Sequence, residues 1–331
     1  MVAGKPLRVV AIGGGTGLSA LLQGLKRHAW TGELDITAIV TVSDDGGSSG
    51  RLRRQFDVLP PGDIRNCMVA LSEDSALLSR LFQYRFETGQ GLKGHSFGNL
   101  FLMALTQIMG DFPDAVKASS EVLNIAGRIF PATAANVALE ATLANGAVVI
   151  GETRISRSKY PIQSIRLRPR KAKPLPETLA AIAEADVITF GPGSLFTSVI
   201  PNLLVDGIPA AVQRSPAVKA YFVNLMSQPG ETTEFSASDH IRALRKHAGG
   251  KLLDYAVINI RAITSAMKTR YAKQQAQPVE NDIDALFELG VKVMAGNLAW
   301  HGETLKHDPE ATAAVVVKLA QEGRRRRASR K

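Results

Sequence analysis

The chain of 331 residues contains a single cysteine, Cys67. One cysteine excludes an internal disulfide framework and a cysteine-based zinc cluster, and such low use suits a reducing compartment. The sequence also lacks an uninterrupted run of about eighteen apolar residues, the length that a membrane-spanning helix needs. The apolar segment 9–25 is broken by a glycine cluster, and no cleavage pattern of small residues follows it. These absences predict a cytoplasmic protein with no membrane span.

Charge is unevenly distributed along the chain. The net charge is +10, from 40 basic and 30 acidic side chains, and six of the basic ones lie in residues 324–331. The rest of the chain is therefore nearly balanced. A short basic end on a balanced body is typical of a solvated appendage rather than a nucleic-acid interface. We expect residues 320–331 to form a disordered tail and expect no specific nucleic-acid partner.

Strand and helix patterns alternate from the start of the chain. Residues 7–12 form an apolar run typical of a buried parallel strand, and a glycine turn follows at 13–17. Leucines then recur at helical spacing from Leu18 to Leu25, and residues 36–42 form a second β-branched run. This order predicts a βαβ unit with a right-handed crossover. Similar strand patterns return at 186–190, 219–223, 254–258 and 291–294.

The middle of the chain departs from this alternation. Residues 63–123 have a helical pattern, broken at 88–94 and at Pro113. The pair Asn145-Gly146 between two strand patterns is a strong hairpin signal. We therefore predict an α/β fold: one Rossmann-like, doubly wound domain over 7–319 with a mostly parallel sheet and an inserted α+β portion at about 129–170.

Three glycine-rich turns follow predicted strands, where ligands bind in open parallel sheets. Glycines there let backbone N–H groups approach an anion closely, and the next helix adds a favourable dipole. Together the turns favour a nucleotide or another phosphorylated ligand. They consist of Gly13, Gly14, Gly15, Thr16 and Gly17; of residues 44–50; and of Gly191, Pro192, Gly193 and Ser194.

The glycine turns fit no standard nucleotide motif. Aligning Gly13 and Gly15 to G-x-G-x-x-G puts Leu18 at the third glycine, and the next acidic pair follows about thirty residues later instead of about twenty. The first turn also lacks the G-K-[ST] of a P-loop. Asp44 and Asp45 could hold Mg²⁺ through substrate phosphates or act as a general base, and they could equally serve turn formation.

Other polar residues allow two interpretations each. Asp63 is expected to cap a helix whose first turn holds Arg65 and Asn66, and Arg65 could reach a phosphate or form a structural ion pair. His95 could shuttle a proton, although a hydrogen-bonded structural role is favoured. Cys67 lies among apolar neighbours at helical spacing, which predicts an inert core thiol.

Six long motifs resemble the bacterial gluconeogenesis-factor family, the YvcK branch of the CofD-like superfamily. The resemblance runs from about residue 7 to 319. The motifs are GGGTGLS (13–19), SDDGGSSGRLRR (43–54), PPGDIRNC (60–67), GHSFGNLF (94–101), GPGSLFTSVIPNLLV (191–205) and NLMSQPGETTEFSASDHI (224–241).

The resemblance implies a cytoplasmic protein tied to gluconeogenic growth, cell shape and wall synthesis. It also implies action through protein partners, and it allows a homo-oligomer. It also implies binding of UDP-sugars, UDP-N-acetylglucosamine in particular. Tyr271 matches a family tyrosine at that site, and Lys306 stands where the family has arginine, which keeps the charge but loses the planar fork. Asn66 and Asn224 lie in the family motifs and are expected to contact the ligand.

The related CofD branch is similar to Mg²⁺-dependent 2-phospho-L-lactate transferases, whose acidic pair matches Asp44 and Asp45. Three hypotheses follow in order of preference. The first is a regulatory protein that binds a UDP-sugar and has no fixed cofactor. The second is a Mg²⁺-dependent transferase of the CofD kind. The third is an NAD-dependent oxidoreductase, which the missing third glycine counts against.

Overall fold

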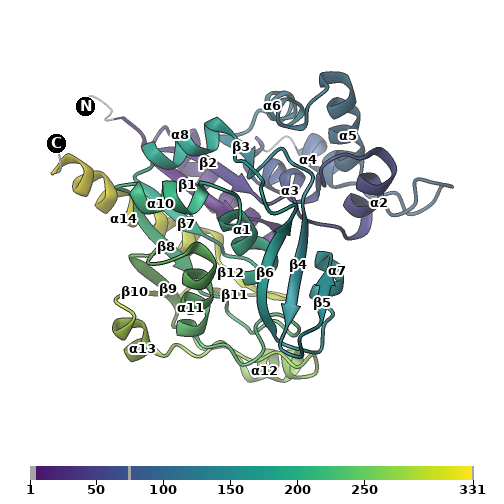
Figure 1. The fold of residues 1–331 in the computed structure, drawn as a ribbon. Coiled ribbons are helices and arrows are strands. Elements are labelled where there is room, and N and C mark those ends of the chain that lie inside the picture. Colours follow the sequence, from purple (N-terminus) through teal and green to yellow (C-terminus); the bar gives the residue numbers. More distant parts are fainter. Residues whose placement is uncertain (1–4, 74–75, 330–331) are drawn as a thin grey trace.

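A seven-stranded sheet, parallel throughout, forms the centre of the protein (Figure 1). The computed structural model describes residues 5–73 and 76–329. The strand order is β10-β9-β8-β7-β1-β2-β3. The prediction of an α/β fold with a mostly parallel sheet is confirmed. The strands are β1 (Leu7–Gly13), β2 (Leu34–Val40), β3 (Arg128–Pro131), β7 (Val187–Phe190), β8 (Val218–Phe222), β9 (Tyr255–Asn259) and β10 (Lys292–Gly296).

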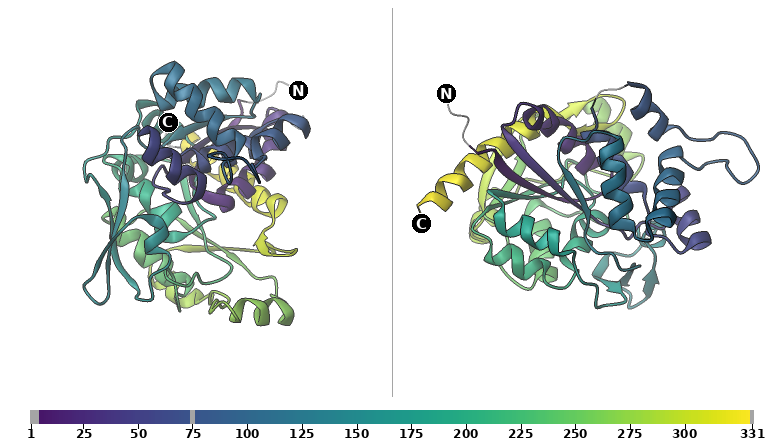
Figure 2. Two further views of the ribbon diagram at one scale, coloured as in Figure 1. Left: turned by 90° about the vertical axis from the view of Figure 1, so that its right-hand side faces the viewer. Right: turned by 90° about the horizontal axis from the view of Figure 1, so that it is seen from above.

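Helices cover both faces of this sheet, as Figure 2 shows from above. One face carries α1 (Gly15–Trp30), α3 (Gly62–Leu71) and α14 (Pro309–Ala328). The other carries α8 (Pro176–Glu184), the π-helix η1 (Leu195–Val199), α9 (Ile200–Leu203), α10 (Ile208–Arg214) and α11 (Ala237–Ala248). Because both faces are covered, the central strands β1 and β7 are almost entirely apolar and buried.

The predicted helical region 63–123 forms separate helices beside β3. These helices are α3, α4 (Ala76–Gln83), α5 (Phe97–Met109) and α6 (Phe112–Val122). The preceding helix α2 (Gly47–Phe56) packs against α5. Pro113 lies in the first turn of α6, where its missing N–H removes no helical hydrogen bond. Two further short helices, α12 (Ser265–Ala272) and α13 (Ile283–Glu288), lie between β9 and β10 in the chain.

A separate antiparallel sheet lies between β3 and α8 in the chain. It contains β4 (Ala138–Leu143), β5 (Val148–Ile150) and β6 (Ile162–Arg168), and the short helix α7 (Glu152–Ile155) follows β5. The hairpin turns at Asn145-Gly146, and Gly146 has the positive φ of 82° that such turns need. Two side chains of α11 hold β6 in place: Lys246 Nζ donates to the Gln163 carbonyl, and His247 Nε2 accepts from the Ile165 N–H.

A small hairpin, β11 (Ala299–His301) and β12 (Leu305–His307), leads directly into the C-terminal helix. Asp308 caps that helix by accepting a hydrogen bond from the Ala311 N–H. Helix α14 then crosses behind β1, β7 and β8 to the end of the sheet opposite the glycine turns.

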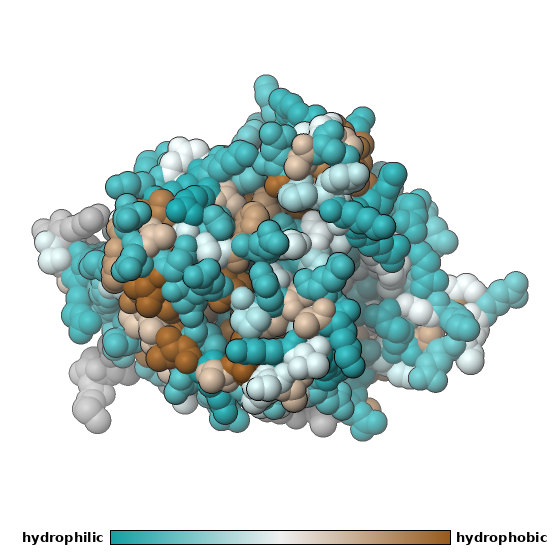
Figure 3. All heavy atoms as spheres, turned by 90° about the horizontal axis from the view of Figure 1, so that it is seen from below, coloured by the Kyte–Doolittle hydropathy of each residue, from teal (hydrophilic) through white to brown (hydrophobic). Residues whose placement is uncertain are grey.

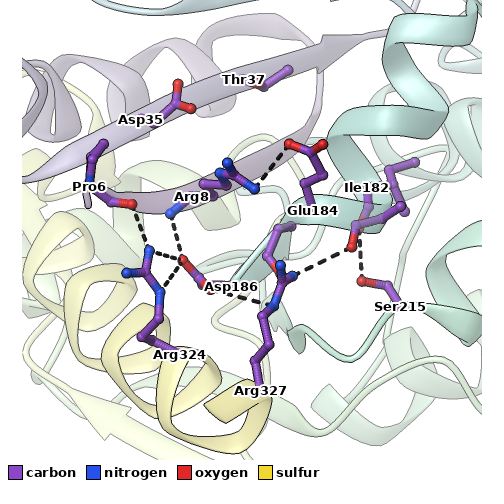
Figure 4. A network of polar contacts seen from close by, with 12 residues as sticks. Pro6, Arg8, Asp35, Thr37, Ile182, Glu184, Asp186, Ser215, Arg324 and Arg327 are labelled. Atoms are coloured by element: carbon purple, nitrogen blue, oxygen red, sulfur yellow. Dashed lines mark hydrogen bonds and ion pairs between the residues drawn. The ribbon is translucent and has the colours of Figure 1, made fainter. Parts of the chain in front are cut away.

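The expectation of a disordered tail at 320–331 is wrong for its described part, because α14 continues to Ala328. Figure 4 shows the reason: Asp186, only 1% exposed at the start of β7, attracts two arginines of this helix. Arg324 donates to its Oδ2 from Nη2 at 2.6 Å and from Nε at 3.1 Å. Arg327 lies 3.8 Å from Oδ1 and donates to the Ala185 carbonyl. Residues 330–331 lie outside the described chain.

No single helix of the described chain is both long enough and apolar enough to cross a membrane. One bent pair, Leu195–Leu203 with Ile208–Arg214, reaches that length and composition only when the two are taken together across a 77° bend. On the face drawn in Figure 3, apolar side chains lie in small groups among hydrophilic ones.

Candidate ligand-binding site

The strand order of the central sheet reverses between β1 and β7. From β1 the chain continues outward to β2 and β3, whereas β7 leads to β8, β9 and β10 in the opposite direction. A crevice opens at such a switch point, outside the carboxyl ends of the two neighbouring strands. The glycine turns 13–17 and 191–194 leave the sheet at these two strand ends.

The two turns touch each other, and glycine makes the approach possible. A Cβ on Gly17 would lie 2.5 Å from the Pro192 carbonyl oxygen, so no larger residue fits there. Behind them, the Asn202 side chain donates from Nδ2 to the Gly13 carbonyl at 3.2 Å and to the Ser198 carbonyl at 2.8 Å. The predicted turns are therefore one structural unit, although they are almost 180 residues apart in the sequence.

A cavity of about 630 Å³ opens in front of these turns. Of the residues that the sequence predicted as ligand-binding, Gly13 and Gly191 lie behind its wall, and Asn66 lines a neighbouring cavity. The other predicted residues line it: Gly14, Gly15, Thr16, Gly17, Pro192, Gly193, Ser194, Asn224, Tyr271 and Lys306.

Hydrogen bonds connect the polar side chains of the cavity wall. Asn224 donates from Nδ2 to Gln228 Oε1 at 3.2 Å, and Gln228 donates from Nε2 to Ser194 Oγ at 2.8 Å. This chain orients the serine of the third glycine turn. Elsewhere in the cavity wall, the Tyr271 hydroxyl accepts from the Leu305 N–H at 3.0 Å and so holds the strand that carries Lys306.

The second glycine turn, residues 44–50, does not reach this cavity. Asp44 Oδ1 accepts from the Gly46 N–H at 2.8 Å, as a turn-forming aspartate does. Asp45 Oδ1 accepts from both the backbone N–H and the hydroxyl of Thr153, at 2.9 and 2.7 Å, which ties the turn to α7. The expected convergence of three turns on one ligand is thus reduced to two.

Carboxyl groups that the sequence did not single out as ligands line the cavity instead: Asp63, Glu152 and Glu231. Asp63 was expected to cap α3, but Pro61 holds the cap position and Asp63 lies in the first turn. Burial raises the pKa of Asp63 to about 6, and the nearby Asp44 carboxylate adds to the shift. Only the fold reveals this role, because Asp63 meets the first glycine turn through a hydrogen bond from Gly15.

The other two carboxyl groups come from distant parts of the chain. Burial, reinforced by the charge of Asp44, raises the pKa of Glu152 to about 9. Burial also raises the pKa of Glu231, although its Oε1 accepts hydrogen bonds from Ser156 and Thr197, both at 3.1 Å. At neutral pH the Glu152 carboxyl is therefore a hydrogen-bond donor rather than an anion. No local sequence signal marks either residue, because each joins the site only through the tertiary fold.

His95 and Cys67 lie outside the cavity wall. His95 is buried and shares a hydrogen bond of 2.9 Å with Ser48 Oγ, and burial lowers its pKa, so the ring is neutral. This agrees with the structural role favoured from the sequence. Cys67 is fully buried and burial raises the pKa of its thiol, as expected for an inert core cysteine.

A magnesium ion does not fit these residues by themselves. Among residues 5–73 and 76–329, no three His, Cys, Asp or Glu side chains are arranged to hold a metal ion. The oxygens Asp44 Oδ1 and Asp45 Oδ1 already accept hydrogen bonds from the protein. Mg²⁺ would need further oxygens from a bound phosphate, as Mg²⁺ in nucleotide sites commonly does.

Comparison with known proteins identifies the family of this chain. The model of the family described as 2-phospho-L-lactate transferase CofD matches residues 9–299. The chain belongs to the CofD family. It is 45% identical over 320 residues to the gluconeogenesis factor of Bacillus subtilis, covering 96% of this chain and all of that protein. It is 46% identical over 314 residues to the gluconeogenesis factor of Halalkalibacterium halodurans, covering 95% and 96% of the two chains.

Solved structures show the same fold in this CofD family. A crystal structure of a Bacillus halodurans protein superimposes with a TM-score of 0.91 at 46% identity, over 96% of this chain and all of that one. Another crystal structure of that protein, described as a member of the UPF0052 family, gives a TM-score of 0.91 at 45% identity. The predicted resemblance to the gluconeogenesis-factor branch is confirmed.

Proposed function

We propose that the cavity between the two glycine turns binds a UDP-sugar of the UDP-N-acetylglucosamine type, and that the chain is a cytoplasmic regulatory protein that responds to this ligand. The observation that carries the proposal is the meeting of two glycine turns at the switch point, in a cavity that Tyr271 and Lys306 also line. The proposed downstream role is control of cell shape and wall synthesis through protein partners.

The diphosphate is assigned to the start of α1. The cap position of this helix is Gly14, and the backbone of residues 14–17 lines the cavity. Backbone N–H groups in the first turn of a helix bind anions well, because they lack intrahelical partners and the helix dipole favours negative charge. Lys306 lines the same cavity and adds a point charge.

Different residues of the cavity wall are assigned to the nucleoside and to the sugar. Tyr271 offers a ring on which a base or a sugar face can stack. Asn224 and the carboxyl groups of Asp63 and Glu152 offer donors and acceptors for sugar hydroxyls. The raised pKa of Glu152 matters here, because a protonated carboxyl group repels a diphosphate less than a carboxylate does.

Thermal denaturation with UDP-N-acetylglucosamine tests the proposal. A one-site ligand at a hundred times its Kd adds about 2.7 kcal/mol to the free energy of unfolding. An unfolding entropy of ~2.1 cal/mol/K per residue converts this gain into a rise in Tm of about 4 °C for 331 residues. NAD at the same concentration should give a smaller rise or none. A rise with NAD and none with any UDP-sugar would overturn the proposal in favour of the dinucleotide hypothesis.

Variants of Tyr271 and Lys306 sharpen this test. Tyr271→Ala should abolish the rise in Tm, whereas Tyr271→Phe keeps the ring and should retain most of it. Lys306→Ala should weaken binding, and more so at high salt, because the lysine is exposed and its charge is screened. Lys306→Arg should preserve or tighten binding. If Tyr271→Ala binds as the wild type does, this wall does not hold the ligand.

Substituting Gly14 is a weak test of the same site, although a side chain at a glycine turn would ordinarily be expected to block a bound phosphate. A Cβ on Gly14 would lie 2.6 Å from Asp63 Oδ2 and 2.7 Å from Thr41 Cγ2. Gly14→Val would therefore disturb packing between α1, α3 and β2 before it blocked a phosphate. A Cβ on Gly193 would lie 3.3 Å from the Gly14 carbonyl oxygen, and the φ of Gly193 is 155°, which L side chains rarely adopt. A substitution of Gly193 would therefore also strain the fold.

A Mg²⁺-dependent transferase of the CofD kind is the second candidate, favoured by the family match and by Asp44 and Asp45 behind the cavity. Under this hypothesis a panel of guanine nucleotides with a deazaflavin acceptor and Mg²⁺ should show turnover. Asp44→Asn and Asp45→Asn should then remove it, because metal binding and general-base action need ionised oxygens. Turnover by the wild type would favour the transferase hypothesis over the regulatory one. No turnover with any substrate of the panel would favour the regulatory protein.

A further inference from the structure

A smaller cavity, of about 350 Å³, opens where β8 and β9 end. Asn224 follows β8 in the chain, and Asn259 is the last residue of β9; both line this cavity. It therefore lies at the carboxyl edge of the parallel sheet, where ligands bind in open α/β folds. We call it the β8–β9 cavity. The rest of its wall comes from Leu225 and from the segment 260–281, which includes α12.

The β8–β9 cavity has two cations in its wall and no acidic residue. Arg261 comes from the loop after β9, and Lys268 comes from α12. Neither forms an ion pair with a carboxylate of residues 5–73 and 76–329, and within these residues the Lys268 ammonium has no hydrogen-bond partner. Cations in a concave site raise the local concentration of anions and favour their binding.

Hydrogen bonds hold Arg261 in place before any ligand binds. Asn259 Oδ1 accepts from the Arg261 N–H at 3.1 Å, and Asn259 Nδ2 donates to the Arg261 carbonyl at 2.9 Å. The same Oδ1 accepts from the N–H groups of Leu298 and Ala299, at 3.0 and 3.1 Å. Arg261 Nη1 donates to the Ala299 carbonyl at 3.0 Å, which orients the guanidinium. A cation fixed in this way loses little conformational freedom when it binds an anion.

Half of the residues that line the β8–β9 cavity are apolar. Leu225, Ile263, Pro278 and Val279 contribute to its wall, and Ile260 keeps 59% of its surface exposed. A ligand that covers Ile260 removes apolar surface from water, which favours binding. The volume is near the lower end of the range for small-molecule sites, so the ligand must be compact.

We infer that the β8–β9 cavity binds a small organic anion, a carboxylate or a phosphate monoester with a compact apolar body, whose charge is held by Arg261 and Lys268. The site is distinct from the proposed nucleotide site. The two cavities share Asn224 and Leu225, but Tyr271, Lys306 and the three carboxyl groups line only the nucleotide cavity. The inference therefore does not depend on the proposed function.

Fluorine NMR of small probes tests this site on the full chain. We would titrate the protein into 4-fluorobenzoate, 4-fluorophenyl phosphate and, as a neutral control of the same shape, 4-fluorobenzyl alcohol. At least one anionic probe should show a saturable change in its fluorine signal, and comparison of the two tells carboxylate from phosphate. The neutral alcohol should show no saturable change, because it lacks the charge that the two cations hold.

Charge variants then locate the bound probe. Arg261→Gln should raise its Kd about tenfold, as the loss of a hydrogen bond to a charged group does. Lys268→Gln should raise the Kd about threefold, because this lysine is exposed and its contact is screened. Lys273→Gln is the matched control, since Lys273 is exposed directly after α12 and lines neither cavity; it should leave the Kd unchanged.

Two further variants keep the test decisive. Arg261 also holds the Ala299 carbonyl, so Arg261→Lys, checked by circular dichroism, replaces Arg261→Gln if the latter unfolds. Arg261→Lys keeps the charge and loses the planar fork, so its Kd should lie between those of the wild type and Arg261→Gln. Lys306→Ala tells the two cavities apart, because Lys306 lines only the nucleotide cavity of these two.

The outcomes separate this site from the proposed function. No saturable response to either anion overturns the site, and so does a response that Lys268→Gln and the Arg261 variants leave as strong as Lys273→Gln does. If Lys306→Ala raises the Kd of the probe as much as Arg261→Gln, the probe lies in the nucleotide cavity and the inference is wrong. A response confined to the β8–β9 cavity, with no rise in Tm from any UDP-sugar, overturns the proposed function and leaves this site in place.

Discussion

Replacing Arg324 by alanine should destabilise the protein measurably, although this residue belongs to a terminal basic run. Its guanidinium makes two hydrogen bonds to Asp186 Oδ2 and donates to the carbonyls of Lys5 and Pro6 (Figure 4). Asp186 is 1% exposed, and the other hydrogen bond to Oδ2 is from the Arg8 N–H at 2.8 Å. Removing Arg324 leaves a buried carboxylate with much weaker compensation.

The magnitude follows from how much of the pair is buried. Breaking a fully buried ion pair by removing one partner costs about 3–5 kcal/mol. Here the Arg324 side chain is 36% exposed, and Arg327 remains 3.8 Å from Asp186 Oδ1. We therefore expect a loss of about 2–3 kcal/mol. With ~2.1 cal/mol/K of unfolding entropy per residue, this loss lowers the Tm of a 331-residue chain by about 3–4 °C.

Urea denaturation and calorimetry of three variants measure this effect. Arg325→Ala is the matched control, because Arg325 is exposed on the same helix and is the next residue in the sequence. It should change the free energy of unfolding by no more than about 0.5 kcal/mol. Arg324→Lys should fall between the two, since it keeps the charge and loses the fork. If Arg324→Ala and Arg325→Ala have the same Tm and the same free energy of unfolding, Arg324 does not anchor the end of α14.

Three further predictions concern other parts of the molecule. Gly323→Ala should lower the Tm despite the better helix propensity of alanine, because the new Cβ would overlap the Asp186 carbonyl and push α14 off the sheet; an unchanged or higher Tm would contradict this packing. Glu152→Gln should flatten the pH dependence of stability between about pH 5 and 9, measured by urea titrations at several pH values. The folded chain keeps a proton on Glu152 up to a pKa of about 9, whereas the unfolded chain releases it near its ordinary value, so wild-type stability falls as pH rises. Cys67 should resist iodoacetamide in the native protein and react fully in urea, because it is buried with a raised pKa; rapid native labelling would refute this assignment.

Local patterns were sufficient for most of the main sheet. Strand patterns at 7–12, 36–42, 186–190, 219–223, 254–258 and 291–294 all coincide with strands of that sheet. The inner strands are buried on both faces and therefore form continuous apolar runs, whereas β10 lies at the edge of the sheet and is only partly buried. The short edge strand β3 was missed as a member of the main sheet. Its four residues, Arg128–Pro131, include an arginine and a proline and so give no such run.

The candidate site was only half visible in the sequence. Glycine turns can be recognised locally, because close backbone approach requires glycine at particular positions such as Gly17. The carboxyl groups Glu152 and Glu231 could not be recognised, because their raised pKa values arise from burial and from neighbours far along the chain. The second turn shows a different limit: the sequence marks Asp45 as a residue with ligand-like chemistry, but it does not reveal that Asp45 Oδ1 accepts two hydrogen bonds from Thr153.

Helix α14 shows where the limit lies. By itself the sequence determined that residues 324–331 are basic and polar, and those properties are typical of a solvated tail. Whether such a segment is ordered depends on a partner that composition does not reveal. Asp186 lies 138 residues away from Arg324, and the sheet alone brings its buried carboxylate to the end of α14. The local sequence thus determined the elements and the turns, whereas the tertiary structure decided which charges are buried and which partners they meet, because burial and pairing depend on distance in space.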